Sequence, residues 1–215
     1  DSIREIGPDT IFVTQFSGIS IMSGEDLNEL LRRPTLTPAD ARAIERQAPS
    51  IASVNVALGE GGPTATRARI HYRGRHTKQL SIIGSTQNYT DVFHIDLELG
   101  RFFTQAEVSH RRQVVVLGQT AYQALFPSID PVGKTVRLGN RPYTVVGVLG
   151  PRPSPGGLNA GQDDLAVIPH TAYQKQFGIR AIRSRRGRFQ SVLIAAVPRQ
   201  GVPLDEAMRD VTEVM

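Results

Sequence analysis

The most constraining feature of the sequence is an apolar run without alternation, QVVVL at residues 113–117. A strand with one face in water alternates apolar and polar residues, whereas a strand covered on both faces reads as a continuous apolar run. This run therefore predicts a central strand with other elements packed on both sides of its sheet. Gly118 follows the strand, and residues 119–126 are expected to form a helix that Pro127 closes.

Three further segments predict helices. In TPAD at residues 37–40, the threonine can cap free backbone N–H groups, the proline suits the first helical position and the aspartate complements the helix dipole. We expect this helix to end near Ala48, before a proline. TQAE at residues 104–107 resembles a capping box. A last helix is expected from about Leu204, because apolar residues then keep a spacing of three or four to Met215.

Alternating residues predict two antiparallel hairpins. Over residues 67–73 the basic side chains of Arg67, Arg69 and His71 fall on one side and the apolar ones on the other. We expect this strand to turn back into residues 78–83. The second hairpin joins residues 134–138 to residues 142–149 around a tight Gly-Asn turn. Residues 99–104 are interpreted as irregular.

Composition places the chain among globular proteins. It has 215 residues, of which 40% are hydrophobic and 21% charged, so it can build a core. Its length corresponds to about one or two domains. The chain has no cysteine, which excludes disulfide scaffolds, thiol nucleophiles and Cys-ligated metals. No apolar run reaches the roughly 18–20 residues of a membrane helix. The chain opens at Asp1 without a methionine, as a piece cut from a longer protein would.

The search for catalytic motifs is negative. Gly133-Lys134-Thr135 resembles the end of a phosphate-binding loop, but a serine occupies the position of its earlier glycine, and two prolines lie in the same stretch. Neither a dinucleotide-binding fingerprint nor a nucleophile elbow is present. The five histidines form no metal-binding motif, and His170 is expected to help begin a helix. The sequence thus predicts no catalytic residue, no cofactor site and no metal site.

The most basic stretch, residues 180–188, is interpreted as a solvated loop. No aromatic residue interleaves with Arg183, Arg185, Arg186 and Arg188 to provide a stacking platform. Two alternatives stay open. One is a nucleic-acid-binding module in which these arginines dominate binding, and the other is an enzyme with an unfamiliar site in a deep polar pocket.

The order of short motifs resembles one known family, the MacB-like periplasmic core domain of MacB/FtsX-type ABC transporter permeases. Each motif is weak alone, and their common order carries the resemblance. The matching segments are residues 6–13 (IGPDTIFV), 36–44 (LTPADARAI), 99–104 (LGRFFT), 115–118 (VVLG), 125–126 (LF), 130–134 (DPVGK), 143–149 (YTVVGVL) and 164–169 (DLAVIP).

The resemblance implies an α+β fold with two lobes. A porter-like lobe of βαβ elements would comprise residues 1–87 plus 163–215, and a small α/β lobe at residues 88–162 would be inserted into it. Membrane helices would flank the domain, so both of its ends should lie close together on the membrane side.

The resemblance also implies a function in transmission. The domain would lie on the periplasmic, extracytoplasmic side of the cell membrane, in a parent that forms a dimer while the isolated domain is monomeric. ATP and Mg²⁺ would bind only to an associated nucleotide-binding domain. ATP hydrolysis in that domain would drive a conformational change in the periplasmic domain. Partners would include a periplasmic adaptor, in efflux, lipoprotein release or regulation of cell-wall hydrolases. Nucleic acid is not expected as a partner.

Partner contacts are expected on long polar loops, because loops carry function more often than packed elements do. The two longest are residues 16–34 and 151–162. The candidate contact residues are Arg32, Arg33, Arg152, Arg183, Arg185 and Arg186.

Overall fold

The computed structural model describes residues 10–15, 35–59, 65–151, 163–179, 181–184, 187–190 and 192–215, with the backbone alone for 181–190. The strands are β1 Ile11–Thr14, β2 Ile51–Leu58, β3 Arg67–Ala68, β4 Ile70–Tyr72, β5 Arg75–His76, β6 Leu80–Ser85, β7 Leu97–Gly100, β8 Val114–Leu117, β9 Thr135–Leu138, β10 Arg141–Leu149, β11 Leu165–Pro169, β12 Ala181–Ser184, β13 Gly187–Gln190 and β14 Val192–Pro198. The helices are α3 Pro38–Gln47, α4 Tyr89–Phe93, α5 Gln105–Ser109, α6 Gln119–Leu125, α7 His170–Phe177 and α8 Leu204–Val214.

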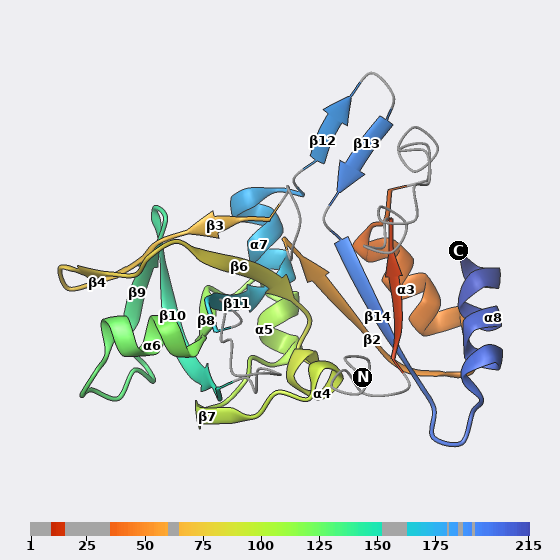
Figure 1. Ribbon diagram of the computed structural model, residues 1–215, viewed down its shortest axis with the longest axis horizontal. Coiled ribbons are helices and arrows are strands. Elements are labelled where there is room, and N and C mark those ends of the chain that lie inside the picture. The colour runs from red at the N-terminus through yellow and green to blue at the C-terminus, as the bar shows by residue number, and fades with distance from the viewer. Residues whose placement is uncertain are drawn as a thin grey trace, which may run out of the picture.

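Within these residues, twelve strands form one mixed sheet (Figure 1). Its order is β1-β14-β2-β6-β11-β8-β10-β9-β4-β5, with β3 beside β6 and β7 beside β10. The pairs β6–β11 and β8–β10 are parallel, and the other pairs are antiparallel. The large mixed sheet and its helices confirm the predicted α+β class.

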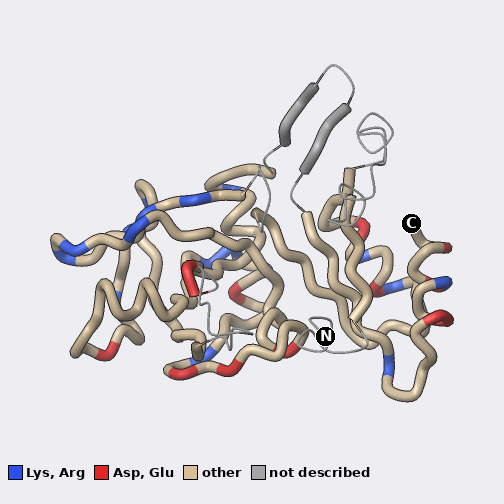
Figure 2. Tube along the Cα trace, in the orientation of Figure 1, with Lys and Arg blue, Asp and Glu red and all other residues tan. Residues whose placement is uncertain are grey.

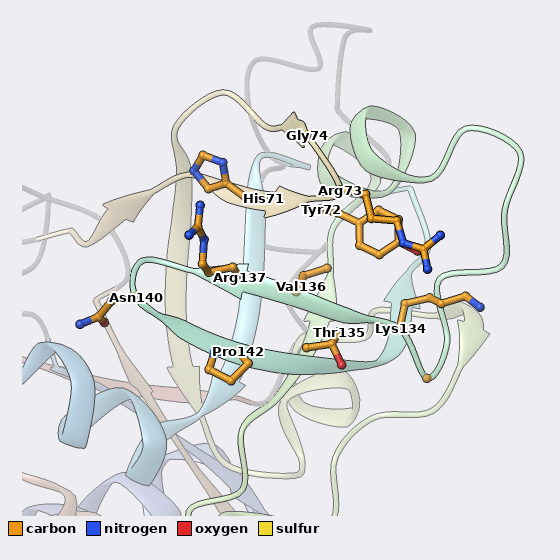
Figure 3. A pocket seen from close by; sticks show the side chains of 11 residues that line it. His71, Tyr72, Arg73, Gly74, Lys134, Thr135, Val136, Arg137, Asn140 and Pro142 are labelled. Carbon is orange, nitrogen blue, oxygen red and sulfur yellow. The ribbon is translucent and has the colours of Figure 1, made fainter.

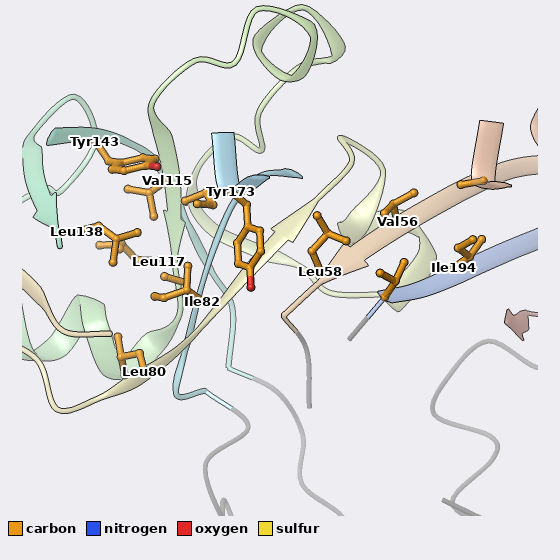
Figure 4. Packing of buried hydrophobic residues seen from close by; sticks show 14 of the residues in the cluster. Val56, Leu58, Leu80, Ile82, Val115, Leu117, Leu138, Tyr143, Tyr173 and Ile194 are labelled. Atoms are coloured by element: carbon orange, nitrogen blue, oxygen red, sulfur yellow. The ribbon is translucent and has the colours of Figure 1, made fainter. Parts of the chain in front are cut away.

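The central strand β8 is covered on both faces, as its apolar run predicts. Val115 and Leu117 belong to one hydrophobic cluster, whereas Val114 and Val116 belong to a second one. The first cluster extends along the sheet from Ile194 to Tyr143 (Figure 4). Helices α3, α6, α7 and α8 contribute residues to it, while α4 and α5 contribute to the second. The sheet is therefore the middle layer of the fold.

The predicted helix starts are confirmed. Thr37 and Asp40 form a reciprocal capping box at α3, and Thr104 and Glu107 form another at α5. The carboxylate of Glu107 also accepts hydrogen bonds of 2.8 and 2.9 Å from both terminal nitrogens of Arg101. Glu107 thus caps the N-terminus of α5 and also holds Arg101 in the preceding turn. None of the described helices is long and apolar enough to cross a bilayer.

Loss of the Glu107 carboxylate is expected to lower the free energy of unfolding at neutral pH and to weaken its dependence on pH in the acid range. The hydrogen bonds from Arg101 lower the pKa of Glu107 from 4.5 to about 2, so the contribution to stability is complete above pH 4.5 and is lost as the pH falls toward 2. In Glu107→Gln, the free energy of unfolding at pH 7 should fall by about 1 kcal/mol. Urea unfolding at pH 7, 4.5 and 3 measures both effects. The exposed Glu213→Gln is the control, and an acid dependence in Glu107→Gln equal to that of the parent chain would contradict the assignment.

Three predicted elements differ in the structure. The strand expected at residues 67–73 is divided: β3 pairs with β6, but β4 leaves to pair with β5 and β9. The segment interpreted as irregular begins with the last two residues of β7, which packs beside β10 because Gly100 faces Gly147. The basic stretch expected as a loop contains β12 and the first two residues of β13, and these strands pair with Arg183 opposite Arg188. Backbone pairing does not depend on side-chain charge, so the arginines concealed this hairpin.

The proposed lobe boundaries stay a prediction. Among the described residues, strand pairing crosses them in two places, because β8 pairs with β11 and β9 pairs with β4. The first hydrophobic cluster also includes residues from both sides of each boundary. At one end of the long axis lie β1 and α8, and at the other end lie β4 and β9 (Figure 1).

Candidate functional site

The predicted contact residues fall where the structure gives no side-chain position. Arg32, Arg33, Arg152, Arg185 and Arg186 lie outside the described residues. Arg183 lies in β12, whose backbone alone is described. The partner-contact prediction and the nucleic-acid alternative for this stretch therefore remain predictions.

A basic pocket of about 600 Å³ lies between the β4–β5 turn and β9 (Figure 3). Its side chains come from two segments far apart in the sequence. Among the described residues, no aspartate or glutamate lines the pocket. The lining residues are His71, Tyr72, Arg73, Gly74, Gly133, Lys134, Thr135, Val136, Arg137, Asn140 and Pro142.

Strand alternation aims the basic residues outward. In β4, Ile70 and Tyr72 are buried, so His71 projects from the opposite face. In β9, Val136 is buried and Arg137 is exposed. The register places His71 opposite His76 on one side and opposite Arg137 on the other. Three basic side chains therefore stand in a row across β5, β4 and β9, with the two imidazole centroids 5.8 Å apart.

The turn between β4 and β5 presents Arg73 at the rim of the pocket. Arg73 has a φ of +43° and Gly74 a φ of +83°. A two-residue hairpin turn with both central residues at positive φ favours Asn-Gly, and a residue with a Cβ pays about 1–2 kcal/mol there. The guanidinium carbon of Arg73 lies 5.5 Å from the centroid of the Tyr72 ring, within the range of a cation–π contact. This turn therefore holds a cation where local backbone preference does not favour arginine.

Charge is segregated along the described chain. Lys and Arg follow the segment from β3 to the β4–β5 turn, while acidic positions gather on α8 and around β7 (Figure 2).

Lys78, which follows β5, forms an ion pair of 2.6 Å with Asp164. Burial raises the pKa of Asp164, but hydrogen bonds from Lys78 and Thr120 outweigh it and leave that pKa lowered. Near the pocket itself, the carboxylate of Asp130 accepts a hydrogen bond of 2.9 Å from the N–H of Val132.

A second, polar cleft of about 950 Å³ lies where α3, β2, α5 and α7 meet. His170, the first residue of α7, lines it, which confirms the predicted place of this histidine at a helix start. Burial lowers the pKa of His170, the charge of Arg42 lowers it further, and a hydrogen bond with the backbone of Ser85 opposes the shift. Within the described residues, Nδ1 of His170 and Oε1 of Gln87 are buried without a hydrogen-bond partner.

This cleft has the polarity that the enzyme alternative requires, but the described residues supply little chemistry to it. They contain no group of three or more His, Cys, Asp and Glu side chains placed to hold a metal ion. The lining offers one carboxylate, that of Glu45, beside the basic Arg42, Arg111 and His170. A buried neutral histidine that bonds the backbone at a helix start fits a structural role.

Sequence reasoning missed the basic pocket. The alternation of Arg67, Arg69 and His71 was a signal for one basic face, but it did not reveal the partner strand. That strand, β9, lies more than sixty residues further along the chain, as the pair His71 and Arg137 shows. In the sequence, Lys134 belongs only to an incomplete phosphate-loop motif, whereas in the structure it lines a pocket.

Comparison with known proteins identifies relatives. Residues 1–214 match the family described as MacB-like periplasmic core domain. The macrolide export ATP-binding/permease protein MacB of Syntrophobacter fumaroxidans is 30% identical over 138 residues, which are 64% of this chain and 18% of that protein. The protein of the same name from Neisseria meningitidis is 34% identical over 151 residues, or 69% of this chain and 21% of that protein. The chain thus spans about a fifth of the length of these relatives.

Two solved structures share the fold. The periplasmic region of MacB from Actinobacillus actinomycetemcomitans aligns with a TM-score of 0.75 at 22% identity, over 100% of this chain and 86% of that chain. The extracellular domain of the noncanonic ABC-type transporter YknZ from Gram-positive bacteria aligns with a TM-score of 0.63 at 18% identity, over 95% and 93% of the two chains.

The family match runs along nearly the whole chain, and the fold likeness covers the same residues. The domain lies on the periplasmic or extracellular side of a membrane permease. The chain belongs to the family of MacB-like periplasmic core domains.

Proposed function

We propose that this domain transmits movement in an ABC transporter permease and does no bond-breaking chemistry itself. ATP hydrolysis in an associated nucleotide-binding part would drive the movement, and ATP and Mg²⁺ would bind there. The observation that carries the proposal is the family match over residues 1–214. Macrolides, named for the curated relatives, are the first substrate class to test.

The connectivity of the sheet supports transmission. Hydrogen-bonded pairing is continuous from β1 and β14 at one end to β9 and β4 at the other. Because protein interiors are close-packed, force applied at one end of such a sheet moves the other end with it. The strand β1 and the helix α8 lie at the same end of the molecule (Figure 1), so flanking membrane helices could act on both.

We draw the proposed partners from the family to which the chain belongs. They are flanking membrane helices of the same chain, an ATP-binding subunit or domain, a periplasmic adaptor, and a second copy of the permease. Each partner would contribute differential contacts in two states, since an equilibrium shifts only by such differences.

Spin-label distances in the full-length permease test the proposal. The domain has no cysteine, so Met208→Cys on α8 and Gln123→Cys on α6 give unique labels within it at exposed sites. Within one domain that carries both labels, the distance between positions 208 and 123 should be the same with and without ATP. Between two copies labelled only at Met208→Cys, the distance from label to label should change with the bound nucleotide.

A permease that binds ATP but cannot hydrolyse it serves as the control, and it should remain in one of the two states. If the Met208→Cys distance between copies is the same in every nucleotide state, the domain does not follow ATP hydrolysis. If the distance within one domain changes as much as the distance between copies, the domain is not a rigid transmitter. Either result overturns the proposal.

A further inference from the structure

We infer that the basic pocket between the β4–β5 turn and β9 is a binding site for a ligand with two phosphate-type anionic groups. The inference stands on the pocket alone and does not depend on the proposed function. It names a shared chemistry, which a soluble phosphate ester or a phosphate-bearing lipid headgroup could supply.

The pocket concentrates positive charge from separate parts of the chain. Arg73 comes from the β4–β5 turn, Lys134 from the loop before β9, and Arg137 from β9 itself. His71 adds an imidazole in register with Arg137. In the part of the chain that the structure describes, no carboxylate lines the pocket to neutralise them. An anion that enters it therefore meets several cations and no repelling charge.

The donors form two groups. Figure 3 shows Arg73 and Lys134 at one end of the pocket and His71 and Arg137 at the other. A guanidinium offers a planar fork of N–H donors that matches two oxyanion oxygens, while an ammonium acts as a point charge. Thr135 and Asn140 line the same pocket and supply neutral donors. Two cationic ends favour a ligand with two anionic groups, such as a diphosphate.

The size of the pocket fits a small molecule. Pockets for small ligands generally occupy about 300–1,000 Å³, and this one has about 600 Å³. That volume holds two phosphate groups with a short organic part between or beside them.

One local feature is unfavourable in the absence of an anion. Arg73 occupies a left-handed backbone position that favours glycine or asparagine. A bound anion would use the guanidinium that the strained turn presents.

Calorimetric titration of the 215-residue chain with inorganic pyrophosphate at low salt tests the site. We expect saturable binding that weakens as salt rises, since screening reduces attraction between exposed charges. In Arg137→Gln and in Lys134→Gln the affinity should fall about tenfold, the equivalent of one charge-assisted hydrogen bond. Arg137→Lys keeps the charge but loses the fork, so its affinity should be intermediate.

Arg46→Gln is the matched control, because it removes an equal charge from the exposed face of α3, outside the pocket. Its affinity for pyrophosphate should remain that of the parent chain, and circular dichroism should show all variants folded. An absence of pyrophosphate binding at millimolar concentration overturns the inference. An equal loss in Arg46→Gln also overturns it, because the attraction would then come from net charge.

A second arm separates the two sources of phosphate. Vesicles of phosphatidylcholine with cardiolipin, a lipid whose headgroup carries two phosphates, are sedimented with the chain. Pyrophosphate binding together with co-sedimentation that Arg137→Gln abolishes assigns the site to a headgroup, whereas pyrophosphate binding without co-sedimentation assigns it to a soluble phosphate ester. Co-sedimentation that Arg137→Gln leaves intact, together with no binding of pyrophosphate, rejects the pocket as the site.

Discussion

Replacement of Tyr173 by alanine is expected to lower the free energy of unfolding by about 3–5 kcal/mol, the range for loss of a large aromatic side chain from a core. Tyr173 lies on α7, and its side chain is fully buried against the neighbouring strands β2 and β6 (Figure 4). A Cβ added at Gly84 would lie 2.5 Å from the Cβ of Tyr173, and one at Gly59 would lie 2.2 Å from its hydroxyl oxygen. The ring therefore packs directly against the two glycines, and a smaller side chain at position 173 would leave a cavity there.

The hydroxyl of Tyr173 makes a separate contribution. It shares a buried hydrogen bond of 2.6 Å with the hydroxyl of Thr66. In Tyr173→Phe the ring remains and this bond is lost, so we expect a loss of about 1–2 kcal/mol. The two variants divide the effect of the residue into packing and hydrogen bonding.

Thermal and urea unfolding measure both Tyr173 variants. For a domain of this size, the alanine variant should melt on the order of 10 °C lower than the parent chain. If Tyr173→Ala and Tyr173→Phe destabilise equally, the ring does not fill the space between the two glycines, and the described packing of α7 is wrong.

The second large effect is expected from Gly100→Ala. Gly100 in β7 lies opposite Gly147 in β10 and has a φ of +69°. A Cβ at Gly100 would lie 2.3 Å from the carbonyl oxygen of Val146 and 3.0 Å from the Cα of Gly147. Backbone atoms cannot rotate away, so β7 must separate from β10. We expect a loss of about 2–5 kcal/mol from the clash and the unfavourable φ together.

Gly74→Ala separates these two causes. Gly74 also has a positive φ, of +83°, but no atom lies within 4 Å of an added Cβ. We expect it to lose only about 1–2 kcal/mol, from backbone strain. Denaturant midpoints of the two variants give the comparison. Equal midpoints would mean that close approach of β7 to β10 is not required.

The sequence predicts those elements whose cause is local. The two capping boxes, the apolar run of β8 and the glycine turn between β9 and β10 each depend on residues within a few positions of one another. They were predicted because side-chain hydrogen bonds, alternation and positive φ are short-range effects.

Elements that depend on distant partners were missed. The four-residue β7 exists because Gly100 meets Gly147, and β4 leaves β6 because Ile70 pairs with Leu138. Neither pairing leaves a mark in the local sequence. The basic pocket shares this cause, since its two halves meet only through the β4–β9 register. The predicted contact arginines were chosen for their charge and for the length of their loops. Neither property specifies which surface a loop contacts.

The pairing of β1 with β14 has a consequence for biogenesis. Ile11 lies opposite Ala196, so the first strand cannot find its neighbour until the chain has been made through β14. At about 5–20 residues per second, the ribosome needs roughly 10–40 s to supply that neighbour. Strand β2 borders β14 as well, and its edge stays open for the same interval. Open strand edges invite aggregation, so the nascent chain is exposed to this hazard at β2 until β14 has been made.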